Sequence, residues 1–278
     1  MLSFLDSSEA KKYAGFAYSI AAHIERGCYP IFPPELKSQD DFQAYYADCC
    51  TAENYYTMRY VGESGEGIIQ FFRIPDDRYI QLCGLYIDGD VSAALYELLH
   101  LMEKNFPGHE LYFGIPAANR AAAENLTSSG FECEEALWHD VFLLDGYSSG
   151  GIPADVVRVT QANFSLFSAL HDADTETYWT SGRIYDDIDN WRIFAVVADD
   201  RACAAAAERG GEIFSLDFDG TLDEETYSKL IKAALHYVSA AGLRYLVFFN
   251  SDSTQDFATR LGFRCFGKYE LYYKKLPE

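Results

Sequence analysis

The spacing of apolar residues along the chain predicts a regular order of strands and helices. Apolar runs, continuous or alternating with polar residues, predict strands, whereas recurrence every three to four residues, as from Val91 to Phe106, predicts one face of a helix. In the first half we expect a strand over 2–5, helices over 7–26 and 35–50, strands over 55–61, 67–74 and 79–87, a helix over 91–106, a strand over 111–115, a helix over 119–129 and a strand over 136–144.

The second half of the chain repeats this order. Its expected elements are a strand over 156–160, helices over 163–173 and 177–188, strands over 192–198, 202–209 and 212–218, a helix over 227–238, a strand over 245–249, a helix over 253–261 and a strand over 268–276. The pair Asp88-Gly89 recurs as Asp219-Gly220, and Gly130-Phe131 recurs as Gly262-Phe263, with an offset that differs by a single position between the two cases. A near-constant register between such pairs predicts a duplicated unit.

A stretch rich in glycine and serine, Gly146 to Pro153, lies between the two halves and is typical of a connection. We therefore predict two tandem domains, 1–146 and 154–278. In each domain the three middle strands form an antiparallel meander, and the strand after the long helix returns parallel to the strand before it. The predicted fold class is α+β with a mixed sheet.

The composition narrows the range of partners. The chain has 22 Lys and Arg against 43 Asp and Glu, a formal net charge of −21. Such a field repels the phosphates of nucleic acids and anionic lipids, so we expect neither a nucleic acid nor a membrane as partner. The same field attracts a cation, which fits a small-molecule amine as ligand.

Seven cysteines without a CxxC pair or a Cys/His cluster predict reduced thiols in a cytoplasmic protein, with no metal site and no nucleophilic cysteine. The first residues lack the basic and apolar regions of a signal peptide, and no apolar run reaches the length of a membrane-spanning helix.

The order of the elements, with a Gly-Phe pair after a short helix and before the last strand, resembles the GNAT acetyltransferase fold. The most specific segment runs from Asn119 to Phe131 and is similar to the family's Asn-x-x-Ala…Gly-Phe signature, and a second copy runs from Asn250 to Phe263. The resemblance covers nearly the whole chain as two tandem units. It implies an N-acetyltransferase that transfers the acetyl group of acetyl-CoA to a small amine.

The resemblance also implies a position for acetyl-CoA. In the family the pantetheine arm lies between two diverging parallel strands, and the pyrophosphate lies on backbone N–H groups where the long helix begins. Because Asp223, Glu224 and Glu225 crowd this helix start in the second half, we expect the site in the first half. The expected coenzyme-binding residues are Leu85, Ile87, Val91, Ser92, Ala93, Asn119 and Arg120. No catalytic residue is assigned, since Leu126 and Ala258 stand where the family usually has a tyrosine.

Two other functions stay open at this point. The loops after Asp88 and Asp219 lack the family's glycine-rich run, which fits a GNAT-fold binding module without transfer activity. The segment from Asp217 to Leu222, DFDGTL, matches the haloacid dehalogenase phosphatase motif, in which the first aspartate is the nucleophile and the second the acid/base. The chain that follows Leu222 is too short for that family's metal-binding core, so we expect a strand end and a helix start here.

Overall fold

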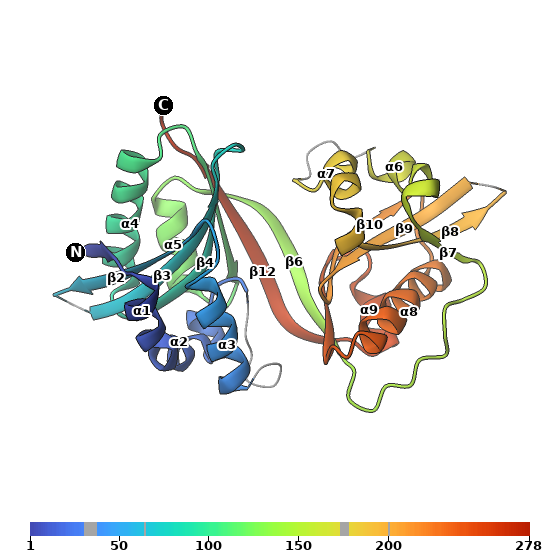
Figure 1. Ribbon diagram of the computed structural model, residues 1–278, viewed down its shortest axis with the longest axis horizontal. Helices are drawn as coiled ribbons and strands as arrows, with labels where there is room; N and C mark the ends of the chain where they lie inside the picture. The colour runs from blue at the N-terminus through green and yellow to red at the C-terminus, as the bar shows by residue number, and fades with distance from the viewer. Residues whose placement is uncertain (31–37, 64, 173–177, 200) are drawn as a thin grey trace. The chain divides into compact units, whose positions relative to one another are not determined.

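Figure 1 shows the computed structural model, which describes residues 1–30, 38–63, 65–172, 178–199 and 201–278. Some predicted residues lie outside the described ones. They are the first residues of the helix over 35–50, the last residue of the helix over 163–173, the first residue of the helix over 177–188, and residue 200 between two predicted strands. The chain forms two compact units, and each is described by itself. Unit 1 consists of Met1–Leu137 and Gly267–Glu278, and unit 2 of Trp138–Phe266.

Unit 1 contains a mixed sheet with strand order β1-β2-β3-β4-β5-β12, in which only β4 and β5 are parallel neighbours. Its strands are β1 Leu2–Phe4, β2 Tyr55–Gly62, β3 Gly65–Ile74, β4 Tyr79–Gly89, β5 Glu110–Pro116, the first part of β6 Glu132–Leu143 and the last part of β12 Arg264–Lys275. Its helices are α1 Ser7–Ala10, α2 Ala14–Ala21, α3 Gln39–Cys49, α4 Val91–Asn105 and α5 Arg120–Ser128, with short 3₁₀ turns at Lys11–Tyr13 and Ile24–Arg26.

Helices cover both faces of the unit 1 sheet. On one face the apolar stripe of α4, with Leu95, Leu98 and Met102, packs against strand residues in the larger core. On the other face Phe42 and Tyr46 of α3 pack with α2 and with the strands in a second core. The stripe predicted from Val91 to Phe106 is therefore confirmed as a buried helix face.

Unit 2 contains a sheet with strand order β6-β11-β10-β9-β8-β7, in which only β10 and β11 are parallel neighbours. Besides residues 138–143 of β6, its strands are β7 Val156–Val159, β8 Arg192–Ala198, β9 Arg201–Arg209, β10 Glu212–Phe218 and β11 Tyr245–Asn250. Its helices are α6 Ser165–His171, α7 Ser181–Asp186, α8 Glu224–Ala240 and α9 Gln255–Leu261, with 3₁₀ turns at Gln161–Asn163 and Ile188–Asn190.

The sheet of unit 2 is also covered on both faces. Buried residues of α8 such as Leu230, Ile231 and Leu235 pack against β8 to β11, together with Ala258 of α9. On the opposite face α6 and α7 close a smaller core around Phe167. The two sequence repeats thus follow the same order of elements, as the sequence pattern predicts, and both units have helices on both faces of the sheet.

The closing strands are exchanged between the two halves of the sequence. Residues 138–143 of β6 pair antiparallel with β11 in unit 2, and residues 269–275 of β12 pair antiparallel with β5 in unit 1. The predicted limits 1–146 and 154–278 therefore follow the sequence repeat, whereas each compact unit contains the closing strand of the other repeat. The mixed α+β class and the parallel return after each long helix are confirmed.

Several elements differ from the pattern-based prediction; β12, for example, begins at Arg264 rather than at residue 268. The helix over 7–26 is interrupted, because His23 has extended dihedrals, φ −108° and ψ 109°, and α2 ends at Ala21. Strand β6 begins at Glu132 rather than at residue 136, since its first residues are exposed and polar and carry no apolar alternation.

Candidate functional site

Unit 1 has an opening between its two parallel strands. β4 and β5 pair only from Tyr79–Leu82 and Glu110–Phe113, and in the described residues this pairing does not extend beyond Leu82. At that point β4 carries one extra residue, Cys83, against β3, which is a β-bulge. A bulge bends its strand and increases the local twist, so β4 turns away from β5. We call the space between Gly84–Gly89 and Gly114–Pro116 the unit 1 opening.

Unit 2 has the equivalent opening. β10 and β11 pair only through Glu212 and Ile213, and β10 carries the extra residue Phe214 against β9. Cys83 and Phe214 are separated by the same offset as the two Asp-Gly pairs in the sequence. The same bulge therefore ends the parallel pairing at the same register in both halves. We call the space between Ser215–Phe218 of β10 and the end of β11 the unit 2 opening.

The structure places three of the predicted coenzyme residues around the unit 1 opening. Leu85 and Ile87 lie on β4 beyond the bulge, and each is 2% exposed. Asn119 is buried at the N-cap of α5, where its side-chain oxygen accepts a hydrogen bond of 3.2 Å from Ala122 N–H. The other four predicted residues lie in the first turns of the two helices: Val91, Ser92 and Ala93 in α4, and exposed Arg120 in α5.

Chain segment Arg26–Tyr29, which we call the occupying segment, lies in the unit 1 opening. Arg26 Nη2 donates to the carbonyl oxygen of Ile87 at 2.6 Å and to Asp88 Oδ1 at 3.0 Å, on the β4 side. Tyr29 N–H donates to the carbonyl oxygen of Gly114 at 2.7 Å, on the β5 side. The segment therefore donates hydrogen bonds to backbone carbonyl oxygens of both diverging strands.

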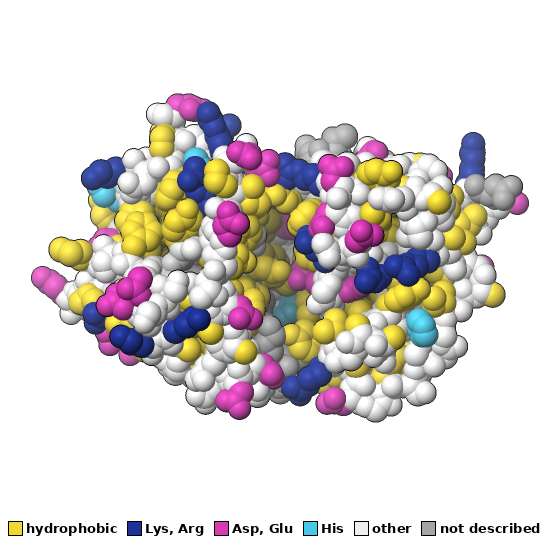
Figure 2. Space-filling view, in the orientation of Figure 1, with side chains coloured by type: hydrophobic (Ala, Val, Ile, Leu, Met, Phe, Trp, Pro, Cys, Tyr) yellow, Lys and Arg dark blue, Asp and Glu magenta, His cyan; other side chains and the backbone are white. Residues whose placement is uncertain are grey.

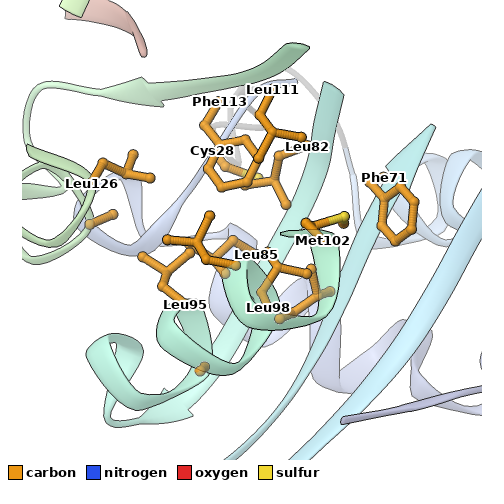
Figure 3. Close-up of a cluster of buried hydrophobic side chains, with 14 of the residues drawn as sticks. Cys28, Phe71, Leu82, Leu85, Leu95, Leu98, Met102, Leu111, Phe113 and Leu126 are labelled. Carbon is orange, nitrogen blue, oxygen red and sulfur yellow. The ribbon is translucent and has the colours of Figure 1, made fainter. Parts of the chain in front are cut away.

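The centre of the occupying segment is buried among core side chains. Cys28 belongs to the larger core of unit 1, and Figure 3 shows its side chain beside Leu82 of β4 and Phe113 of β5. Burial raises the pKa of the Cys28 thiol to about 12, although a hydrogen bond to the backbone of Leu85 opposes this shift. Asn119 Nδ2 donates to the carbonyl oxygen of Gly27 at 2.8 Å, so the predicted coenzyme contact binds the chain itself.

The start of α4 is also occupied. Asp90 Oδ1 accepts hydrogen bonds from the backbone N–H groups of Ser92 at 2.9 Å and Ala93 at 3.2 Å. These are the donors that the family resemblance implies for the pyrophosphate. A carboxylate that caps a helix satisfies its free N–H groups and places a negative charge beside them.

The start of α8 in unit 2 carries more acid, but its charges are paired. Asp223 caps the helix by accepting a hydrogen bond of 2.7 Å from Thr226 N–H, which lowers the pKa of the Asp223 carboxyl. Glu224 lies 2.8 Å from Arg260, and Glu225 lies 2.7 Å from Lys229. The local excess of negative charge is therefore smaller than the sequence alone suggests.

The residues of the unit 2 opening are more accessible. Leu216 and Phe218 correspond to Leu85 and Ile87 in the register of the repeat. Leu216 is partly buried, and Phe218 is 41% exposed. Among the residues that the structure describes, no backbone group from outside the sheet bonds to either of them.

A buried His–Asp pair lies beside the unit 2 opening. His171 Nδ1 is 3.0 Å from Asp217 Oδ2, and His171 Nε2 is 2.6 Å from the carbonyl oxygen of Trp179. Both partners can accept hydrogen bonds, so a protonated imidazole can donate from both nitrogens at once. Burial lowers the pKa of His171, but the bonds to Asp217 and Trp179 outweigh it, so the pKa is raised above its ordinary value.

Aromatic rings surround this pair. The rings of Trp179 and Trp191 are 5.1 Å apart, and Phe214, the bulged residue of β10, lies 5.4 Å from Trp191. Phe214 is exposed, so the cluster has an accessible edge beside Asp217. Sequence reasoning missed this cluster, because its members come from three separate segments and no spacing connects them.

Two other polar side chains, Asn250 and His139, lie inside unit 2. Asn250, in the second copy of the signature, is buried and donates to Asp140 Oδ2 and Tyr227 Oη, each at 3.3 Å. His139 of β6 stacks on Phe249 with ring centroids 5.1 Å apart, and burial lowers its pKa to about 4. His139 is therefore neutral near pH 7.

The part of the chain that the structure describes has no evident metal centre. Among those residues, no group of three His, Cys, Asp or Glu side chains is placed to hold a metal ion. None of the helices formed by the same residues is long and apolar enough to cross a membrane. All seven cysteines are free thiols.

Comparisons with known proteins agree on the fold. No protein-family model matches the chain, and no curated protein matches it in sequence. Among solved structures, a GCN5-related N-acetyltransferase from Sphaerobacter thermophilus aligns over 100% of this chain and 96% of its own, with TM-score 0.63 and 10% identity. A Drosophila protein aligns over 99% and 98% of the two chains, with TM-score 0.60 and 12% identity. A GNAT-family acetyltransferase from Colwellia psychrerythraea aligns over 99% of both, with TM-score 0.50 and 10% identity.

The fold of this chain is therefore the GNAT fold, and the matches span both units. The DFDGTL string lies at the end of β10 and in the loop before α8 of this fold. Its first aspartate, Asp217, pairs with buried His171. The string is a strand end and helix start, as expected, and it does not lie in a haloacid dehalogenase fold.

Proposed function

We propose that this chain is an N-acetyltransferase that transfers the acetyl group of acetyl-CoA to a small amine. The observation that carries this proposal is the loss of parallel pairing after the bulge, at Leu82 in unit 1 and at Ile213 in unit 2. Strands that diverge within a sheet leave backbone N–H and C=O groups without strand partners. The amide groups of a pantetheine arm have the donors and acceptors to pair with them.

The reaction needs few side chains. The ammonium first releases a proton to solvent, and the nitrogen of the neutral amine then attacks the thioester carbonyl carbon. The C–S bond breaks, and the sulfur leaves as the thiol of CoA after taking up the second proton that the nitrogen loses. Backbone N–H groups that face the thioester oxygen stabilise the negative charge that develops there. The net negative charge of the chain favours an amine as ligand, because amines reach the protein as cations. Figure 2 shows acidic and basic side chains mixed over the visible face, with no single basic patch that would repel such a ligand.

Unit 2 offers an aromatic surface beside its opening. The ring of Phe214 is 37% exposed and can contact both the ammonium group and the apolar part of an amine. We also propose a cytoplasmic location, from the free cysteines, and no nucleic-acid or membrane partner, from the net charge.

The test of this function has two steps. Acetyl-CoA at millimolar concentration should raise the melting temperature of the protein, because a ligand that binds the native state stabilises it. A panel of small amines with acetyl-CoA should then release free CoA thiol, measured with a thiol reagent against a sample without protein. Absence of both effects supports the alternative of a GNAT-fold binding module without transfer activity.

A further inference from the structure

We propose that the unit 2 opening, and not the unit 1 opening, receives the pantetheine arm, because the occupying segment closes unit 1 from within. This inference rests on the proposed function and assigns it to one of the two equivalent openings. It reverses the expectation from the sequence, which assigned acetyl-CoA to Leu85, Ile87, Val91, Ser92, Ala93, Asn119 and Arg120 of unit 1; no observation tests that expectation directly.

The occupying segment uses the groups that a pantetheine arm would need. On β4 the carbonyl oxygen of Ile87 accepts from Arg26, and the Cys28 side chain is buried in the same core cluster as Leu85. On β5 the carbonyl oxygen of Gly114 accepts from Tyr29 N–H. A ligand in this position must first remove a buried side chain and several hydrogen bonds, each of which leaves a buried polar group without a partner.

The helix side of the unit 1 opening is closed as well. The amide of Asn119 is fixed at both ends, with its nitrogen on Gly27 and its oxygen on Ala122 N–H. The guanidinium of Arg26 also pairs with Asp88, near the end of β4. The segment is therefore held by β4, β5 and α5 together.

In the part of unit 2 that the structure describes, the equivalent positions are more exposed than those of unit 1. Because Asp219 N–H donates to Cys203 in β9, strand alternation directs the N–H groups of Leu216 and Phe218 away from β9 and toward the opening. Phe218 is 41% exposed, whereas its counterpart Ile87 is 2% exposed. Ser215 Oγ, just beyond the bulge, is buried and has no hydrogen-bond partner among the described residues.

The charge argument that favoured unit 1 is weakened by the structure. Arg260 and Lys229 pair with the first-turn acids of α8, so two cations lie at this helix start. In unit 1 the corresponding donors are capped by the Asp90 carboxylate. Neither helix start is therefore better suited to a pyrophosphate, and access to the strand backbone decides between the units.

Hydrogen–deuterium exchange of the full chain with and without CoA tests the assignment. The expected result is slower exchange in peptides covering residues 212–222 of unit 2, with unchanged exchange in peptides covering residues 80–93 of unit 1. Protection confined to 80–93 overturns the assignment. Protection in neither region overturns the proposed function, and the assignment with it.

A matched pair of variants provides an independent readout. Ser92 in the first turn of α4 and Thr221 just before the N-cap of α8 are both exposed, so Ser92→Glu and Thr221→Glu each add one negative charge near the start of a long helix. In calorimetric titrations with CoA, Thr221→Glu should weaken binding by about fivefold, the effect of one like charge at about 4 Å in water, and Ser92→Glu should bind as wild type. Weakening by Ser92→Glu alone contradicts the proposal, and melting curves show whether both variants are folded.

Discussion

Asn119 of α5 donates a hydrogen bond of 2.8 Å from its side-chain amide to the carbonyl oxygen of Gly27. The two residues are 92 positions apart in the chain, and their bond joins the N-cap of a helix to the occupying segment. The residue that most resembles a coenzyme contact in the sequence is thus a structural contact in unit 1.

Replacement of Asn119 by alanine should loosen the occupying segment. The variant loses the bond to Gly27, and a net loss of about 0.5–1.5 kcal/mol raises the population of the open segment roughly 2- to 10-fold. Cys28 should therefore react faster with a disulfide reagent in the native protein, which mass spectrometry of the labelled peptides measures.

The control for this experiment is Ser38→Ala. Ser38 caps α3 through a capping box with Asp41, so its loss destabilises a helix of unit 1 without touching the occupying segment. Labelling of Cys28 should stay at the wild-type rate in this variant. Equal rates in Asn119→Ala and Ser38→Ala contradict a specific role of the Gly27 bond.

His171 should make stability fall as the pH rises. Its native pKa is raised above the ordinary 6.5, so its contribution to the free energy of unfolding is fully present below about pH 6.5 and is lost as the pH rises through the native pKa. In urea titrations from pH 5.5 to 8.5, wild type should lose stability relative to His171→Gln, with a slope of at most about 1.4 kcal/mol per pH unit. If the difference in free energy of unfolding between the two proteins does not change with pH, the pKa of His171 is not raised in the native state.

His139 should act with the opposite sign. Burial lowers its native pKa to about 4, so its contribution is present above the ordinary value of 6.5 and is lost as the pH falls from 6.5 toward 4. His139→Phe keeps a ring for stacking on Phe249 and removes the titrating group. The variant should therefore retain more of its stability at pH 5 than wild type in urea unfolding, and parallel acid limbs for the two proteins would contradict this.

Two glycines should respond in opposite directions to alanine. A Cβ at Gly67 would lie 2.7 Å from the carbonyl oxygen of Tyr86 and 3.1 Å from Ile87 Cα, and backbone atoms cannot give way. Gly67→Ala should therefore lower stability by about 1–3 kcal/mol. Gly15 in α2 has its nearest neighbour at 3.9 Å, so Gly15→Ala should raise stability by about 0.5–1 kcal/mol. Thermal unfolding of both variants checks the pair, and equal shifts contradict the steric argument.

Cleavage of the connection should not separate the two halves of the chain. A protease site introduced within Gly146–Pro153 produces two fragments, and each contributes a closing strand to the unit built mainly from the other. The cleaved protein should elute in gel filtration as one species with the volume of the uncut protein. Two separate peaks under native conditions would show that the exchanged strands do not keep the two fragments together.

Local patterns in the sequence predict most of the secondary structure. β8 and β10 have the predicted bounds, because their apolar runs end at clear turn residues. The buried stripes of α4 and α8 follow from the helical period alone. The bounds and buried faces of these elements are set by residues close together in the sequence, so the spacing of apolar residues is enough to predict them.

Contacts between distant residues could not be predicted in this way. β6 and β12 occupy corresponding positions in the two repeats, so the pattern gives no reason for either strand to prefer its own repeat. The bond from Arg26 to Ile87 joins a turn to a strand 61 residues away and leaves no periodic trace. The family resemblance therefore implies the two openings, and the sequence gives no sign that one of them is filled.

The exchange of closing strands also affects how the protein is made. Domains usually fold in order as they leave the ribosome, the first before the second is complete. Here β5 of unit 1 lacks its partner until residues 269–275 have been synthesised. The first unit to be translated is therefore the last to be finished, and throughout elongation β5 presents an unpaired edge on which chaperones or aggregation can act.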